Sequence, residues 1–138
     1  MAHWALDYIG SPWAPDADGP EHFACWGLVR HVFRTRHRVE LPHVVIRDGA
    51  IDEAVLVNVR AIKQAVQTTG WRQVPAGERP LEDDVVVMRS AVRLHVGVVI
   101  RANGSLGVMH SEHACGVVFQ RWADATDGMT TELWRRSA

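Results

Sequence analysis

Residues 94–110 read LHVGVVIRANGSLGVMH, and this stretch predicts a β-hairpin. Residues 94–100 and 106–110 have the apolar character of strands, and Asn103-Gly104 between them is the dipeptide that tight hairpin turns favour. In the simplest register the numbers of paired residues sum to about 207, so that position 110 lies opposite position 97 and next to position 95. His95 and His110 are therefore expected to lie close together on neighbouring strands.

Further strands are predicted on both sides of this hairpin. They are rich in β-branched or aromatic residues, have turn residues between them, and span residues 71–74, 85–89 and 117–122. Residues 132–135 are expected to add a last strand at the edge of the sheet. The second half of the chain therefore predicts an antiparallel sheet of about five to six strands.

The first half of the chain predicts helices. The expected segments are a short helix at residues 2–9, an irregular loop at 10–22, a helix at 25–36, an extended or loop stretch at 39–46 and a second helix at 51–67. In the helix at 25–36, Leu28, Val29, Val32 and Phe33 share one apolar face. Helices followed by an antiparallel sheet predict an α+β fold, with the N-terminal helices packed on the sheet.

The composition is that of one globular domain over residues 1–138. Hydrophobic residues make up 47% and charged residues 22% of the chain, and 15 basic residues nearly balance 16 acidic ones, which disfavours a general nucleic-acid binder. The sequence has no apolar run of roughly 18 to 20 residues and no Sec-type signal at its start. We therefore expect a protein that is made in the cytoplasm and does not insert into a membrane.

Cys25 is a candidate nucleophile. It follows the proline- and glycine-rich loop and begins the helix at 25–36, where unpaired N–H groups and the helix dipole favour a thiolate. A cysteine beside Phe23, Trp26 and Leu28 is equally typical of an ordinary buried residue. The only other cysteine is Cys115, and a single bridge between the two remains open at this point.

His95 and His110 are candidates for the base and for a residue that orients it. His95 lies in the middle of an apolar strand, and Gly97 on the same side of that strand leaves room for a helix end to approach. His110, on the next strand, is placed to hold the His95 ring and stabilise its cation. Taken singly, each is also typical of a structural histidine, but nucleophile, base and orienter in this chain order fit a papain-like arrangement.

Six segments between about Tyr8 and Val118 read YIGSPW, FACWGLVRHVF, ELP, DDVVVMR, HVGVVI and MHS. Together they resemble the NlpC-type cell-wall cysteine peptidases, especially the phage-tail and prophage branch of that family. The resemblance implies a papain-like α+β fold and hydrolysis of amide bonds in peptidoglycan stem peptides. It also implies action at the cell wall, within a virion or after lysis, with phage tail proteins as possible partners. No cofactor is expected.

The resemblance assigns roles to individual residues. Cys25 matches the nucleophile, His95 the general base and His110 the third polar residue, and Tyr8 matches an aromatic residue that assists at the oxyanion or substrate side. The backbone N–H groups around Cys25 and Trp26 are the candidate donors to the oxyanion.

Two positions depart from the family pattern. Ala24 stands where the family usually has aspartate, and Asp83 stands where it usually has the glycine before Asp84. An aspartate before the helix would cap it, at about 1 kcal/mol, so its loss is expected to loosen the site more than abolish it.

Four other interpretations remain open. His110, His113, Cys115 and Cys25 could form a metal site, although they lack the usual ligand spacing. Arg30, Arg34, Arg36 and Arg38 cluster as in a phosphate-binding surface, but are more typical of a solvated helix end. An inactive structural module of a phage tail tip, or an acyltransferase or amidase of the same fold, would share the sequence features of a peptidase.

Overall fold

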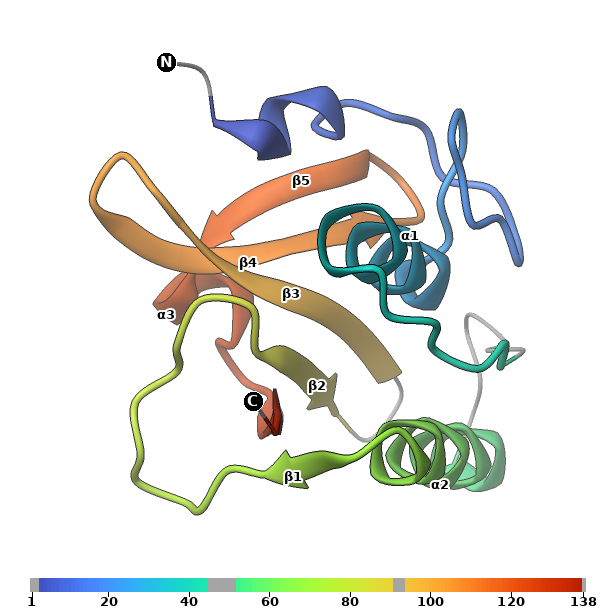
Figure 1. Ribbon diagram of the computed structural model, residues 1–138, viewed down its shortest axis with the longest axis vertical. Helices are drawn as coiled ribbons and strands as arrows, with labels where there is room; N and C mark the ends of the chain where they lie inside the picture. The colour runs from blue at the N-terminus through green and yellow to red at the C-terminus, as the bar shows by residue number, and fades with distance from the viewer. Residues whose placement is uncertain (1–2, 45–51, 91–93, 138) are drawn as a thin grey trace.

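The computed structural model describes residues 3–44, 52–90 and 94–137, with side chains in α2 described from residue 60 (Figure 1). The elements follow the order η1 (Trp4–Asp7), α1 (Cys25–His37), α2 (Asp52–Thr68), β1 (Trp71–Gln73), β2 (Val85–Arg89), β3 (Leu94–Ala102), β4 (Ser105–Glu112), β5 (Gly116–Arg121), α3 (Trp122–Ala125) and β6 (Thr130–Arg136). Helices thus precede an antiparallel sheet, and the predicted α+β fold is confirmed.

The sheet has six strands in the order β1-β6-β2-β3-β4-β5, and every neighbouring pair is antiparallel. The hairpin of β3 and β4 has the predicted register, because Val98 pairs with Met109 and Ala102 with Ser105. Asn103 and Gly104 both have positive φ, as a two-residue hairpin turn with a matching twist requires. The local turn therefore fixes which residues of the two strands face each other.

The predicted position of the last strand is wrong. Residues 132–135 were expected at the edge of the sheet, but β6 lies between β1 and β2, so that β1 and β5 form the two edges. Trp134 of β6 is buried in the main core, and Leu133 packs against a second cluster. β6 pairs through its backbone with β1 on one edge and with β2 on the other, and this pairing joins segments that are far apart in the chain.

Two smaller differences concern short helices. The strand predicted at 117–122 ends at Arg121, and Trp122 begins α3, a single turn that the sequence pattern did not indicate. The helix predicted at 2–9 is the 3-10 helix Trp4–Asp7. Of the extended or loop stretch predicted at 39–46, residues 39–44 contain neither helix nor strand, and residues 45 and 46 lie outside the described part of the chain.

The main core lies between α1 and the sheet (Figure 1). All four residues of the predicted apolar face of α1 are fully buried there. The alternation along β2 sends Val85 and Val87 into this core and Val86 and Met88 into the smaller cluster, against which Trp122 packs. Within the described residues, no helix is both long enough and apolar enough to cross a membrane.

His31 on α1 gives the stability of the fold a dependence on pH. Burial lowers the pKa of His31 from 6.5; the nearby charge of Arg34 lowers it further, while Asp18 opposes the shift. The unfolded chain therefore binds a proton at His31 more readily than the folded one. The contribution of neutral His31 to the free energy of unfolding is present above pH 6.5 and is lost as the pH falls. We expect urea titrations at about pH 7.5 and 5.5 to show a smaller loss in His31→Gln than in the unchanged protein. Equal losses would contradict this assignment.

Candidate active site

Cys25 is the first residue of α1 and is 8% exposed. The loop before it is held against the helix, because the N–H of Ala24 donates to the carbonyl of Ala17 at 2.8 Å. Gly27 permits this contact, since a Cβ at that position would lie 1.9 Å from the same carbonyl oxygen. The sequence thus places a thiol at the positive end of a helix whose start is fixed by the loop.

Ala24 forms the N-cap of α1 without a side-chain hydrogen bond. Its backbone is extended (φ −78°, ψ 169°), as an N-cap residue requires. We expect Ala24→Asp to raise the free energy of unfolding by about 1 kcal/mol, because a carboxylate there can accept from N–H groups of the first turn. Urea unfolding measures this, and Ala24→Asn supplies the cap without the charge. If both variants unfold like the unchanged protein, the helix start does not lack a cap.

Ser111 on β4 connects the sheet to the segment that precedes Cys25. It is buried, and its hydroxyl donates to the carbonyl of Phe23 at 2.6 Å, two residues before Cys25. The sequence pattern did not indicate this role for Ser111. Its position next to His110 could have marked it as a candidate site residue, but its acceptor, Phe23, is distant in the chain.

The two predicted histidines lie together, and His95 is the one that lines the pocket. Nε2 of His95 and Nδ1 of His110 are 2.7 Å apart, and the rings are nearly perpendicular. Gly97 allows this approach, because a Cβ there would lie 3.1 Å from the Cβ of His110 and closer still to Val108. The space that Gly97 leaves is therefore filled by β4, whereas the sequence suggested a helix end.

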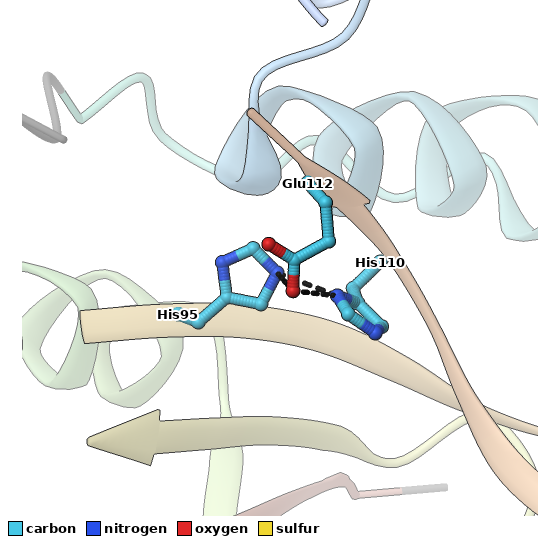
Figure 2. Close-up of side chains that lie close together, drawn as sticks. All are labelled: His95, His110 and Glu112. Carbon is cyan, nitrogen blue, oxygen red and sulfur yellow. Dashed lines mark hydrogen bonds and ion pairs between the residues drawn. The ribbon is translucent and has the colours of Figure 1, made fainter. Parts of the chain in front are cut away.

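Two further side chains, Glu112 and Gln120, contact this histidine pair, and the sequence pattern indicated neither of them. An oxygen of Glu112 lies 3.2 Å from Nδ1 of His110 and 3.8 Å from Nε2 of His95 (Figure 2). On the other side of His110, Nε2 lies 2.7 Å from the amide oxygen of Gln120. Figure 2 shows His95 on β3 facing His110 and Glu112 on β4, with its second ring nitrogen on the far side of the ring.

One pocket is lined by both the candidate nucleophile and the candidate base. Its lining comprises Trp13, Asp16, Asp18, Ala24, Cys25, Trp26, Gly27, Arg30, His43, Val44, His95 and Ser111. The structure thus brings Cys25, His95 and Trp26 to one surface. The indole N–H of Trp26 donates to the carbonyl of Pro42 at 2.9 Å and holds the wall of the pocket.

Tyr8 is not brought into this lining. Its side chain is buried against Phe23 and His31, and its hydroxyl lies 3.1 Å from Nδ1 of His31. In this position Tyr8 supports the packing of α1.

The residues of the described chain that could hold a metal are His95, His110 and Glu112. This is not the set considered from the sequence, because the ring of His113 packs on Trp13 and Cys115 is exposed while Cys25 is buried. Ligand nitrogens at roughly 2.0 to 2.1 Å from a tetrahedral zinc ion would be about 3.3 Å apart. The 2.7 Å between His95 and His110 is a hydrogen-bond distance, so the cluster is better described as a hydrogen-bonded chain.

Arg30 and Arg34, two of the four clustered arginines, make side-chain contacts within the protein. Arg30 donates to Asp18 and to the carbonyl of Leu41, and Arg34 pairs with Asp18 and Glu40. These contacts hold the loop around Asp18 and the segment at Glu40 and Leu41 against α1. The charges of these two arginines therefore stabilise the fold.

The sequence matches no model of a known protein family and no curated protein. The structure is similar to the crystal structure of the NlpC/p60 domain of the peptidoglycan hydrolase SagA, with a TM-score of 0.61 over 94% of this chain and 91% of that chain. The fold is that of an NlpC/p60 domain. Sequence identity over this similarity is 14%, so it establishes the NlpC/p60 fold and leaves the chemistry to the residues of the site.

Proposed function

We propose that this NlpC/p60-fold protein is a cysteine peptidase that hydrolyses an amide bond in peptidoglycan stem peptides. The observation that carries the proposal is a pocket lined by both Cys25 and His95, with His95 hydrogen-bonded to His110. The similarity to the domain of a peptidoglycan hydrolase supports the choice of substrate. Asp16, Asp18 and Arg30 in the same lining give the pocket both signs of charge, which suits a peptide that carries amino and carboxylate groups.

The proposed reaction begins when His95 takes the thiol proton of Cys25. The thiolate attacks the carbonyl carbon, and backbone N–H groups in the first turn of α1, at Cys25 and Trp26, stabilise the oxyanion. The C–N bond then breaks as His95 returns the proton to the leaving amine, which leaves a thioester. Water, deprotonated by His95, hydrolyses the thioester and regenerates the thiol.

A digestion of purified muropeptides tests this proposal. We expect mass spectrometry to show two products whose summed mass exceeds that of the substrate by one water. Prior treatment with iodoacetamide should prevent the reaction, in the unchanged protein and equally in Cys115→Ala, which lacks the exposed thiol. No product, or product formed undiminished after alkylation, would overturn the proposal. A product joined to an added amine would indicate acyl transfer.

We further propose a phage or prophage origin, in which the protein is made in the cytoplasm and reaches the wall within a tail or after lysis. The support is the resemblance of the CWGLVR and HVGVVI segments to that branch of the family. The uncapped start of α1 at Ala24 favours a second candidate, a tail module of low activity. That module would bind muropeptides without cutting them, which the same digestion distinguishes.

A further inference from the structure

Gln120 on β5 is the outermost member of a chain of hydrogen bonds that ends at the proposed base. In the antiparallel pair of β4 and β5, Gln120 lies opposite Val108, two residues from His110. Its amide oxygen lies 2.7 Å from Nε2 of His110, whose Nδ1 lies 2.7 Å from Nε2 of His95. His110 is 2% exposed, so its ring nitrogens depend on His95 and Gln120 for hydrogen bonds.

When His110 is neutral, the order of donors and acceptors along this chain sets the positions of the protons. An amide oxygen only accepts, so Nε2 of His110 carries a hydrogen and donates it to Gln120. A neutral His110 then has an acceptor at Nδ1, and the hydrogen in the 2.7 Å contact must come from Nε2 of His95. A neutral His95 protonated at Nε2 has its basic lone pair on Nδ1, the nitrogen on the far side of the ring in Figure 2.

This tautomer of His95 is the one that the proposed reaction needs. With the proton on Nε2, Nδ1 is the atom that takes the proton of Cys25, and the resulting imidazolium donates to His110. Glu112 then stabilises the cation, because its carboxylate lies 3.8 Å from Nε2 of His95 and 3.2 Å from Nδ1 of His110. With the opposite tautomer, Nδ1 of His95 would already carry a proton.

We propose that Gln120 is a positioning residue of this site, which acts through His110 to hold the proton of neutral His95 on Nε2 and so leaves Nδ1 as the base for Cys25. The assignment rests on the proposed peptidase function, since it describes how the base of that reaction is prepared. Gln120 itself lies outside the pocket lining and is not expected to touch the substrate.

Two substitutions of Gln120 distinguish a role as hydrogen-bond acceptor from a role in packing alone. Gln120→Leu removes the acceptor at similar size, and we expect it to lower kcat roughly 10-fold with KM changed less than 2-fold, which is the upper end for the loss of one hydrogen bond between neutral groups. Gln120→Glu retains an oxygen acceptor and is expected to keep most of the activity. Arg121→Leu, the neighbouring exposed residue on β5, is the matched control and should leave activity unchanged.

Measurements that do not need the substrate complete the test. Nitrogen NMR of labelled imidazoles in a Cys25→Ala background is expected to show Nε2–H forms of His95 and His110, which Gln120→Leu converts to mixed tautomers and Gln120→Glu retains. Alkylation of Cys25 at pH 6 in a Cys115→Ala background should also slow roughly 10-fold in Gln120→Leu. Unchanged tautomers in Gln120→Leu, or an equal loss in Gln120→Glu, would overturn the proposal.

Failure of the peptidase function itself would have a different signature. The unchanged protein would then cleave no muropeptide, while the NMR and alkylation results could still show that Gln120 controls His95. Thermal unfolding of each variant shows whether it is folded under the assay conditions.

Discussion

Replacement of Cys25 by alanine is expected to lower muropeptide hydrolysis by about three orders of magnitude or more. In the proposed reaction the thiolate of Cys25 forms the covalent bond to the substrate, and no other residue of the pocket lining is a thiol. The remaining groups can still bind the peptide and polarise its carbonyl, but they cannot form the thioester. The measurement is the initial rate of product formation by mass spectrometry.

The matched control is Cys115→Ala, which removes the exposed cysteine and should leave the rate within 2-fold of the unchanged protein. The Cys25→Ala variant should still bind muropeptides, because the charged residues of the pocket are intact. A Cys25→Ala protein that retains a tenth of the activity would show that Cys25 is not the nucleophile.

Asp84→Asn is expected to lower the free energy of unfolding by about 3 kcal/mol or more. Asp84 is 1% exposed and accepts two hydrogen bonds of 2.8 Å from the guanidinium of Arg135, which joins the start of β2 to the end of β6. The same carboxylate accepts from the N–H of Leu81 at 2.8 Å, and its hydrogen bond with Arg135 raises the pKa of that arginine. An asparagine of the same shape turns an N–H group toward the guanidinium and leaves Arg135 with the half-exposed Glu78, 3.6 Å away, as its charged partner.

Glu78→Gln is the matched control for this variant. Glu78 also pairs with Arg135, at 3.6 Å, but its side chain is half exposed, so we expect a loss below about 1 kcal/mol. Urea unfolding compares the three proteins under one condition. Equal stabilities of Asp84→Asn and Glu78→Gln would show that the buried pair does not hold β6 in the sheet.

The features of the fold that depend on local sequence patterns were predicted correctly. The Asn103-Gly104 turn set the register of β3 and β4, and with it the closeness of His95 and His110. The spacing of apolar residues likewise identified the buried face of α1 and, to within one residue, its bounds.

The features that were missed depend on contacts between distant segments. The place of β6 is decided by its pairing with β1 and β2, which no local signal encodes. The contact between Gln120 and His110 depends on the pairing of β4 with β5, and that between Ser111 and Phe23 on the packing of the loop against β4. The motif resemblance gave Tyr8 a place near the thiol, but its hydroxyl contacts His31.

The consecutive residues His110, Ser111 and Glu112 give β4 two tasks at once. Because side chains alternate along a strand, His110 and Glu112 meet His95 while Ser111 holds the backbone before Cys25. A shift of one residue in the register of the hairpin would turn each of these side chains to the opposite face of the sheet. The contacts with His95 and with the backbone before Cys25 would then be lost together. Under the proposed function, the two-residue turn at the other end of the hairpin therefore constrains the catalytic geometry, although it lies outside the pocket lining.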